Sequence, residues 1–141
     1  SYSERGLREL RISKTEALTG NAYAILRLAA FYYDSGHPRQ AEKYAKEFLE
    51  FDKEDYFAIQ MLSGTYLEQK KYAEAEKFLL PLAKKGNTQA QWFLAMGYFE
   101  TKKFKEAESW AKKALAGAKR EGSFSKHIEQ LLMMLDGELN K

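Results

Sequence analysis

Three alanines placed about one repeat length apart constrain the fold of this chain more than any other feature. Ala41, Ala75 and Ala107 are spaced by 34 and 32 residues, and a Glu follows each of them. A leucine lies 13 residues before each alanine, and a tyrosine lies 9 residues before it. Because the repeats coincide at two independent offsets, they predict one structural unit that occurs three times.

The apolar residues within each unit follow the period of an α-helix. They recur at i, i+3, i+4 and i+7, which places them on one face of a helix. A second stripe with the same period begins at each anchor alanine, so each unit is predicted to be a helix–turn–helix hairpin. The first stripes are Ile25, Leu28, Ala29 and Tyr32; Ile59, Leu62, Ser63 and Tyr66; and Gln91, Leu94, Ala95 and Tyr98. Short loops are expected at Gly36, Lys70, Lys102 and Gly122.

This pattern resembles the tetratricopeptide repeat, whose unit of about 34 residues carries Leu, a small residue and Tyr before a central Ala. The resemblance implies an all-α helix-turn-helix solenoid, a right-handed superhelix of about eight helices. It implies a single domain over residues 1–141. The expected parts are an N-terminal helix or half repeat over 1–20, with its helix over 3–18, repeats over 22–55, 56–87 and 88–121, and a capping helix over 122–141. The chain departs from the family pattern at Lys53, where a closing Pro is usual, and at Pro81, which stands inside a predicted helix and is expected to kink it.

Composition excludes several classes of protein. The chain has 141 residues, of which 45% are hydrophobic, so it is not a disordered chain. It has no cysteine, which excludes disulfides and thiolate chemistry and leaves the compartment open. No apolar run approaches the ~20 residues of a membrane helix. Because the chain opens on Ser1–Tyr2 without Met, we expect it to be an excised or processed piece, and its parent could be associated with a membrane.

The sequence offers no assembly of catalytic groups. His37 lies in a predicted turn and His127 in the last predicted helix, and neither has the spacing of a metal site. Glycine-rich phosphate loops and the GxSxG nucleophile motif are absent from the sequence. We therefore expect no enzymatic activity, cofactor, metal ion or small-molecule substrate.

Binding of a protein or peptide is the favoured function. In the tetratricopeptide family, first helices line a concave surface, and the matching positions here are rich in aromatic residues and Met, which act as binding anchors. Only Arg27 would suit the carboxylate clamp of family members that hold acidic peptide ends. The expected partner therefore offers an apolar or amphipathic segment. The expected partner-binding residues are Tyr23, Leu26, Arg27, Tyr33, Phe57, Gln60, Met61, Gln89, Trp92, Met96, Phe99 and Glu100.

Other interpretations of the same residues stay open. The lysines around Lys112 and Lys113 form a basic stretch, so contact with nucleic acid or anionic lipid is a less favoured alternative. Met133 and Met134 could form an apolar edge for self-association, or the chain could be part of a longer repeat array. The groove aromatics could instead pack between repeats, with the terminal helices folded over them. The irregular repeats, rich in Ala and Lys, resemble bacterial proteins that help to assemble secretion, pilus or exopolysaccharide machinery at the envelope.

Overall fold

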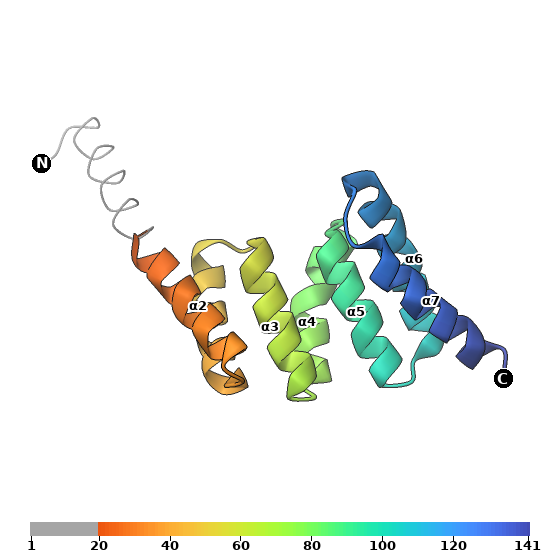
Figure 1. Cartoon of the computed structure of the whole chain (residues 1–141), viewed down its shortest axis with the longest axis horizontal. Helices are drawn as coiled ribbons and strands as arrows, with labels where there is room; N and C mark the ends of the chain where they lie inside the picture. The colour runs from red at the N-terminus through yellow and green to blue at the C-terminus, as the bar shows by residue number, and fades with distance from the viewer. Residues whose placement is uncertain (1–19) are drawn as a thin grey trace, which may run out of the picture. The chain divides into compact units, whose positions relative to one another are not determined.

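The computed structural model describes residues 20–141, which contain seven helices and no strand. About eight helices were expected for the whole chain, and the helix predicted over residues 3–18 lies outside the described residues. The first described helix covers residues 20–34. It is followed by α2 (Pro38–Phe51), α3 (Tyr56–Glu68), α4 (Tyr72–Lys84), α5 (Thr88–Glu100), α6 (Phe104–Glu121) and α7 (Ser125–Leu139), as Figure 1 shows. The predicted all-α fold is confirmed.

The chain divides into two compact units, and the boundary between Leu62 and Ser63 falls within α3. In the first unit, rings from helix 20–34 pack on α2. Tyr32 stacks on Tyr44 with centroids 5.7 Å apart and planes 9° apart, and Tyr23 lies 6.1 Å from Phe48. Because the later residue of one helix contacts the earlier residue of the other, the two helices form an antiparallel hairpin.

Each hairpin turn closes in the same way. The N–H of His37 donates to the carbonyl of Tyr32 at 2.9 Å. The N–H groups of Lys71 and Lys103 each donate to the carbonyl of the repeat tyrosine five residues earlier, at 2.8 Å. The residue before each donor has a left-handed backbone conformation. These residues are Gly36 (φ 73°), Lys70 (φ 58°) and Lys102 (φ 63°). These bonds cap the carbonyl end of each first helix, and they confirm the loops predicted at these positions.

In the second unit, α5 lies between α4 and α6. Figure 1 shows α5 and α7 on the near side, with α4 and α6 behind them. The buried Gln91 side chain donates from Nε2 to the Ala83 carbonyl at 3.1 Å, which joins α5 to α4. Thr88 Oγ1 donates to Glu121 at 2.8 Å, which joins the start of α5 to the end of α6. A Cβ added at Gly117 of α6 would overlap the Thr88 side chain, so a glycine is needed for this close approach.

The repeat leucines confirm the predicted packing face in the second and third repeats and contradict it in the first repeat. Leu62 and Leu94 are 2% and 3% exposed, whereas Leu28 is 42% exposed. Leu94 lies beside residues of α4, so a leucine in this register is buried against the hairpin that precedes it. No described helix precedes residues 20–34. The prediction that Leu28 would be buried on this face was therefore wrong.

Two features of the sequence are accommodated inside helices. Pro81 stands within α4, which continues past it to Lys84. Ser63 stands where the repeat requires a small residue, and its hydroxyl is buried without a hydrogen-bond partner among the described residues. Small volume at this position therefore outweighs the cost of burying an unpaired hydroxyl.

Candidate partner-binding residues

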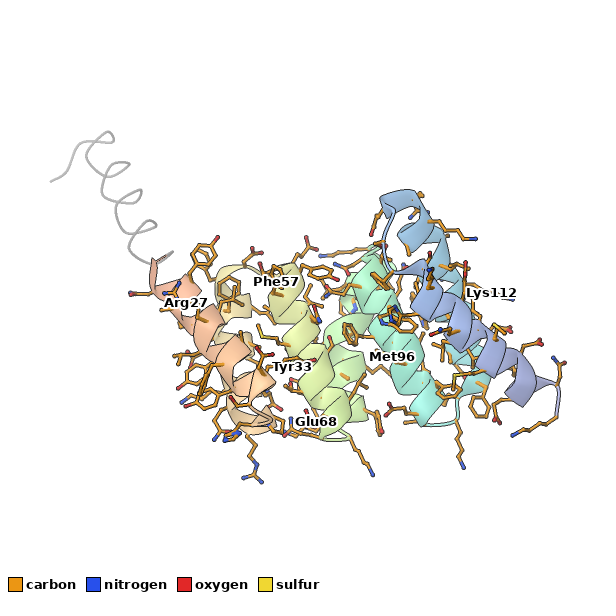
Figure 2. All side chains as sticks on the ribbon, in the orientation of Figure 1. Arg27, Tyr33, Phe57, Glu68, Met96 and Lys112 are labelled. Carbon is orange, nitrogen blue, oxygen red and sulfur yellow. The ribbon has the colours of Figure 1, made fainter. Side chains whose placement is uncertain are left out.

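Two of the predicted partner-binding residues of the first unit are strongly exposed aromatics. Tyr23 is 51% exposed and Phe57 is 62% exposed. Arg27 is also exposed, while Leu26, Tyr33 and Gln60 are half-buried. Figure 2 labels Arg27 and Tyr33 on helix 20–34 and Phe57 on α3. Exposed aromatic side chains of this size are the usual anchors of protein interfaces.

Two further aromatics extend this set. Phe51 ends α2 and is 44% exposed, and its ring lies 6.0 Å from that of Phe48, on which Tyr23 also packs. Tyr56 begins α3, is 51% exposed and contacts Phe57 edge-on at 5.6 Å. We call Tyr23, Phe51, Tyr56 and Phe57 the aromatic surface. Sequence reasoning missed Phe51 and Tyr56, although their place at either end of the link between two helices could have indicated exposure.

Two carboxylates in residues 52–55, the link between Phe51 at the end of α2 and Tyr56 at the start of α3, accept hydrogen bonds from backbone N–H groups. Asp55 Oδ2 accepts a hydrogen bond from the Ala58 N–H at 2.9 Å and so caps the start of α3. Asp52 Oδ1 accepts from the Glu54 N–H at 3.2 Å, which closes a turn just after α2. The acidic residues of this link therefore hold Phe51 and Tyr56 in place, and they also make its surroundings negative.

Met61 and Gln89 do not have the outward positions that were predicted for them. Each is only 6% exposed. In α3, the residues from Ala58 to Tyr66 are buried at almost every position, so the apolar face is much wider than one stripe. Gln89 lies in the first turn of α5, where four consecutive residues are buried. A repeat helix with neighbours on several sides buries more of its circumference than a single amphipathic face indicates.

The predicted residues of α5 pack inside the second unit. Trp92, Met96 and Phe99 are half-buried against the core formed by α5, α6 and α7. The Trp92 ring lies 6.2 Å from Phe124, the residue that precedes α7, and Phe99 lies 5.7 Å from Phe104. This is the alternative in which groove aromatics pack between helices. The aromatic side chains of α5 are therefore less available to a partner than the sequence predicted.

Glu100 differs from its neighbours because it is exposed at the end of α5. Its carboxylate accepts a hydrogen bond of 2.7 Å from the Tyr72 hydroxyl at the start of α4. That hydrogen bond, helped by partial burial, raises the pKa of the Tyr72 phenol. Glu100 therefore ties α5 to α4, and this contact accounts for its position without a partner.

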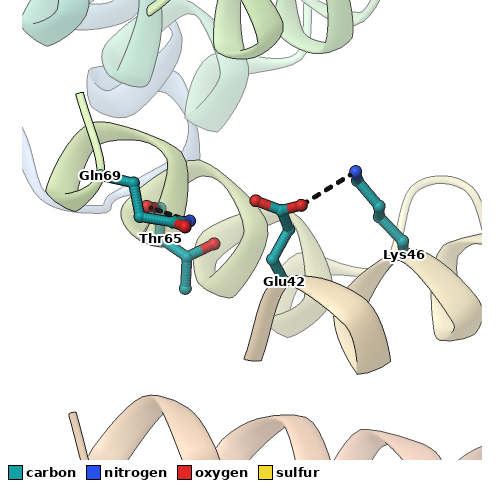
Figure 3. Close-up of polar contacts among 4 residues, drawn as sticks. All are labelled: Glu42, Lys46, Thr65 and Gln69. Carbon is teal, nitrogen blue, oxygen red and sulfur yellow. Dashed lines mark hydrogen bonds and ion pairs between the residues drawn. The ribbon is translucent and has the colours of Figure 1, made fainter. Parts of the chain in front are cut away.

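Some charged residues of the helix surfaces are paired along their own helices. Lys112 lies 3.6 Å from Glu108, and Lys113 lies over the Trp110 ring at 4.5 Å from its centroid. Figure 3 shows two further contacts across one helical turn, Lys46 with Glu42 at 3.1 Å and the Gln69 amide with the Thr65 carbonyl at 3.0 Å. The exposed ion pairs Lys46–Glu42 and Lys112–Glu108 are typical of a solvated helix face and are worth little stability each.

Residues with catalytic or metal-binding chemistry are dispersed. His37 contacts the Ser35 carbonyl through Nδ1 at 3.0 Å, within its own turn. Among residues 20–141, His, Asp and Glu form no group of three that could hold a metal ion. Across the same residues, no helix is both long enough and apolar enough to cross a membrane.

A concavity that the sequence did not indicate lies between α4 and α5. It has a volume of about 800 Å³ and is lined mainly by apolar side chains. Leu80 and Pro81 line it from α4, and Phe93 and Leu94 line it from α5. We call it the α4–α5 pocket. Its residues come from two hairpins, so no periodicity within a single helix could have revealed it.

Comparisons with known proteins agree with the fold. Residues 93–121, which span most of the α5–α6 hairpin, match the family described as Tetratricopeptide repeat. The NMR structure of the first TPR domain of the human RPAP3 protein is similar, with a TM-score of 0.59 and 20% sequence identity. The similarity covers 82% of this chain and 95% of that one. The chain has the tetratricopeptide-repeat fold. Among curated proteins, no sequence matches it.

Proteins with the tetratricopeptide-repeat fold share a general way of using it. Families with this repeat are generally non-catalytic modules that bind other proteins. Their stacked helix pairs create extended surfaces for such binding. The fold therefore supports a protein–protein interaction scaffold as a class, and the partner must be inferred from the side chains that this particular chain exposes.

Proposed function

We propose that this protein recruits a partner protein by binding an apolar or amphipathic segment on the first helices of its repeats. The proposal takes the repeats as residues 22–55, 56–87 and 88–121. The observation that carries it is the aromatic surface, in which Tyr23, Phe51, Tyr56 and Phe57 are each between 44% and 62% exposed. Exposed aromatic side chains of this kind are frequent anchors of interaction sites.

Charge around the aromatic surface favours a partner segment with basic residues. The link after Phe51 carries Asp52, Glu54 and Asp55 against a single Lys53. Exposed carboxylates beside aromatic anchors attract a cationic segment and disfavour an acidic one. Arg27 is the one exposed cation among the predicted partner-binding residues of the described chain. An amphipathic helix with Lys or Arg flanking its apolar face fits this combination.

A matched pair of variants tests the proposal. Phe57→Ala should weaken capture of the partner at least about ten-fold, because it removes an exposed anchor. Phe31→Ala is the control, since Phe31 is also 62% exposed but was not predicted to bind. The wild type and both variants would be immobilised, partners captured from cell lysate would be identified by mass spectrometry, and affinities would be measured with purified partner. Equal loss in both variants would indicate non-specific apolar adhesion and would reject the proposal.

Self-association is a second candidate, and exposed methionines favour it. Met133 and Met134 on α7 are 75% and 55% exposed, and methionine adapts readily to apolar partners. If α7 pairs with a second copy, replacing both methionines by Glu should convert dimers to monomers in analytical ultracentrifugation. A monomeric wild type at every accessible concentration would remove this candidate.

The finer assignment to bacterial envelope assembly rests on the style of the repeats. It stays a prediction, and the identity of the captured partner tests it. A component of a secretion, pilus or exopolysaccharide machine among the proteins lost with Phe57→Ala would support it.

A further inference from the structure

The α4–α5 pocket uses residues that the aromatic surface does not. Its apolar wall consists of Leu79, Leu80 and Pro81 from α4 together with Phe93 and Leu94 from α5. Leu79 and Leu94 are buried, while Leu80 and Phe93 are half-exposed. Gly97 also lines the pocket, and because it has no side chain it leaves space open at that part of the wall. A volume of about 800 Å³ is large enough for several apolar side chains of a partner.

The rim of the pocket is mainly positive. Lys77 and Lys84 from α4 and Lys103 after α5 line it, and all three are exposed. Lys77 and Lys84 are seven residues apart, which is two turns, so they stand on the same side of α4 about 10 Å apart along the axis. Two like charges at this separation can contact acidic residues seven apart on a second helix.

The one carboxylate that lines the pocket already has a partner. Glu76 accepts a hydrogen bond from the Tyr98 hydroxyl. Burial of Tyr98, together with the negative charge of Glu76, raises the pKa of this phenol to about 12. Lys103 lies over the same ring, 5.9 Å from its centroid. Glu76 therefore belongs to the wall of the pocket, and the lysines set the charge that a ligand meets.

Pro81 gives the wall a further polar feature. Proline has no N–H, so the carbonyl of Lys77, four residues earlier, lacks its usual donor within α4. Lys77 and Pro81 both line the pocket, so this backbone change occurs in its wall. α4 ends three residues after Pro81, at Lys84.

We propose that the α4–α5 pocket is a second binding site, which takes an amphipathic helix of a partner protein through its apolar face and its flanking Asp or Glu residues. The apolar wall would hold leucine-like side chains, and Lys77, Lys84 and Lys103 would contact the carboxylates. The preferred charge is opposite to that favoured by the aromatic surface. The two sites therefore select different segments, and this proposal does not depend on the first one.

A peptide titration followed by ¹⁵N–¹H NMR tests the proposal on the whole chain. The probe is a helical peptide of about 15 residues with a leucine stripe flanked by glutamates seven apart. A second peptide has lysine in place of each glutamate. The acidic peptide should shift amide signals within α4, α5 and the turn at Lys103. Absence of such shifts, or equal shifts with the lysine peptide, would overturn the proposal.

Charge reversal supplies the matched variants. Lys77→Glu with Lys84→Glu should weaken the acidic peptide about ten-fold or more, since two attractions become repulsions. Lys112→Glu with Lys113→Glu changes the net charge by the same amount on α6 and should leave the affinity nearly unchanged. An equal effect of both pairs would mean that only overall charge matters, which rejects a defined pocket.

Two further variants separate this proposal from the proposed function. Leu80→Ala should weaken the acidic peptide through the loss of apolar contact, with amide spectra showing that the fold is kept. Phe57→Ala should leave that peptide unaffected. If Phe57→Ala abolishes binding of the acidic peptide while Leu80→Ala does not, the peptide binds at the aromatic surface and the pocket proposal fails.

Discussion

Aromatic side chains on the first helices of the repeats have different surroundings in the first unit and in the second unit. Tyr23 and Phe57, near the starts of two first helices, are more than half exposed. Trp92 and Phe99, on the first helix of the third repeat, are half-buried and contact Phe124 and Phe104. Position along the helix accompanies the difference, since Trp92 and Phe99 lie further along α5, where they meet residues that begin α6 and precede α7. A repeat pattern therefore specifies the helix, while the adjacent helices determine whether its aromatics are available to a partner.

The largest expected effect compares Trp92 with Phe57. Trp92→Ala should lower the free energy of unfolding by about 3 kcal/mol, because it removes a ring packed on the α6–α7 core. Phe57→Ala should lower it by less than about 1 kcal/mol, because the ring is mostly exposed. Urea denaturation followed by circular dichroism measures both. Similar losses in the two variants would contradict the contrast between the units.

A smaller effect concerns the close approach of α5 and α6, on which the burial of the α5 aromatics depends. Gly117→Ala should destabilise the protein by about 1–3 kcal/mol, since the new methyl group would overlap Thr88. Gly137→Ala in α7 is the control, because nothing lies within 4 Å of a Cβ built there. That change should stabilise the protein by about 0.5–1 kcal/mol through helix propensity. Thermal melts of both variants would show shifts of opposite sign, and shifts of the same sign would refute the packing argument.

The smallest effect compares the hairpin turns of the two units. Gly36 and Lys102 occupy the same left-handed position, which costs a lysine about 1 kcal/mol more than a glycine. Lys102→Gly should therefore raise the free energy of unfolding by about 0.5–1 kcal/mol, and Gly36→Ala should lower it by a similar amount. Chemical denaturation with identical buffers resolves both. If Lys102→Gly is destabilising, the lysine side chain must contribute more to the turn than its backbone strain removes.

The sequence predicted the helices and the turns well because both depend on local chemistry. The spacing of Leu94, Tyr98 and Ala107 indicates helical faces, and the left-handed turn residues recur at the expected loops. The exposure of the candidate site was predicted less well. Burial of Met61 and Gln89, and exposure of Leu28, depend on which helices pack beside them. The α4–α5 pocket is invisible to periodicity for the same reason, since its walls come from two hairpins.

The shared closure of the hairpin turns has a consequence for how this chain can change length. Three residues separate the helices in each repeat hairpin, and all three hairpins share the same closing bond, at His37, Lys71 and Lys103. The links between hairpins differ, with four residues from 52 to 55 and three from 85 to 87. We therefore expect insertions and deletions to occur in the links between hairpins and not in the hairpin turns. A reporter group attached at Lys53, which is exposed in the link between α2 and α3, would leave every hairpin closed.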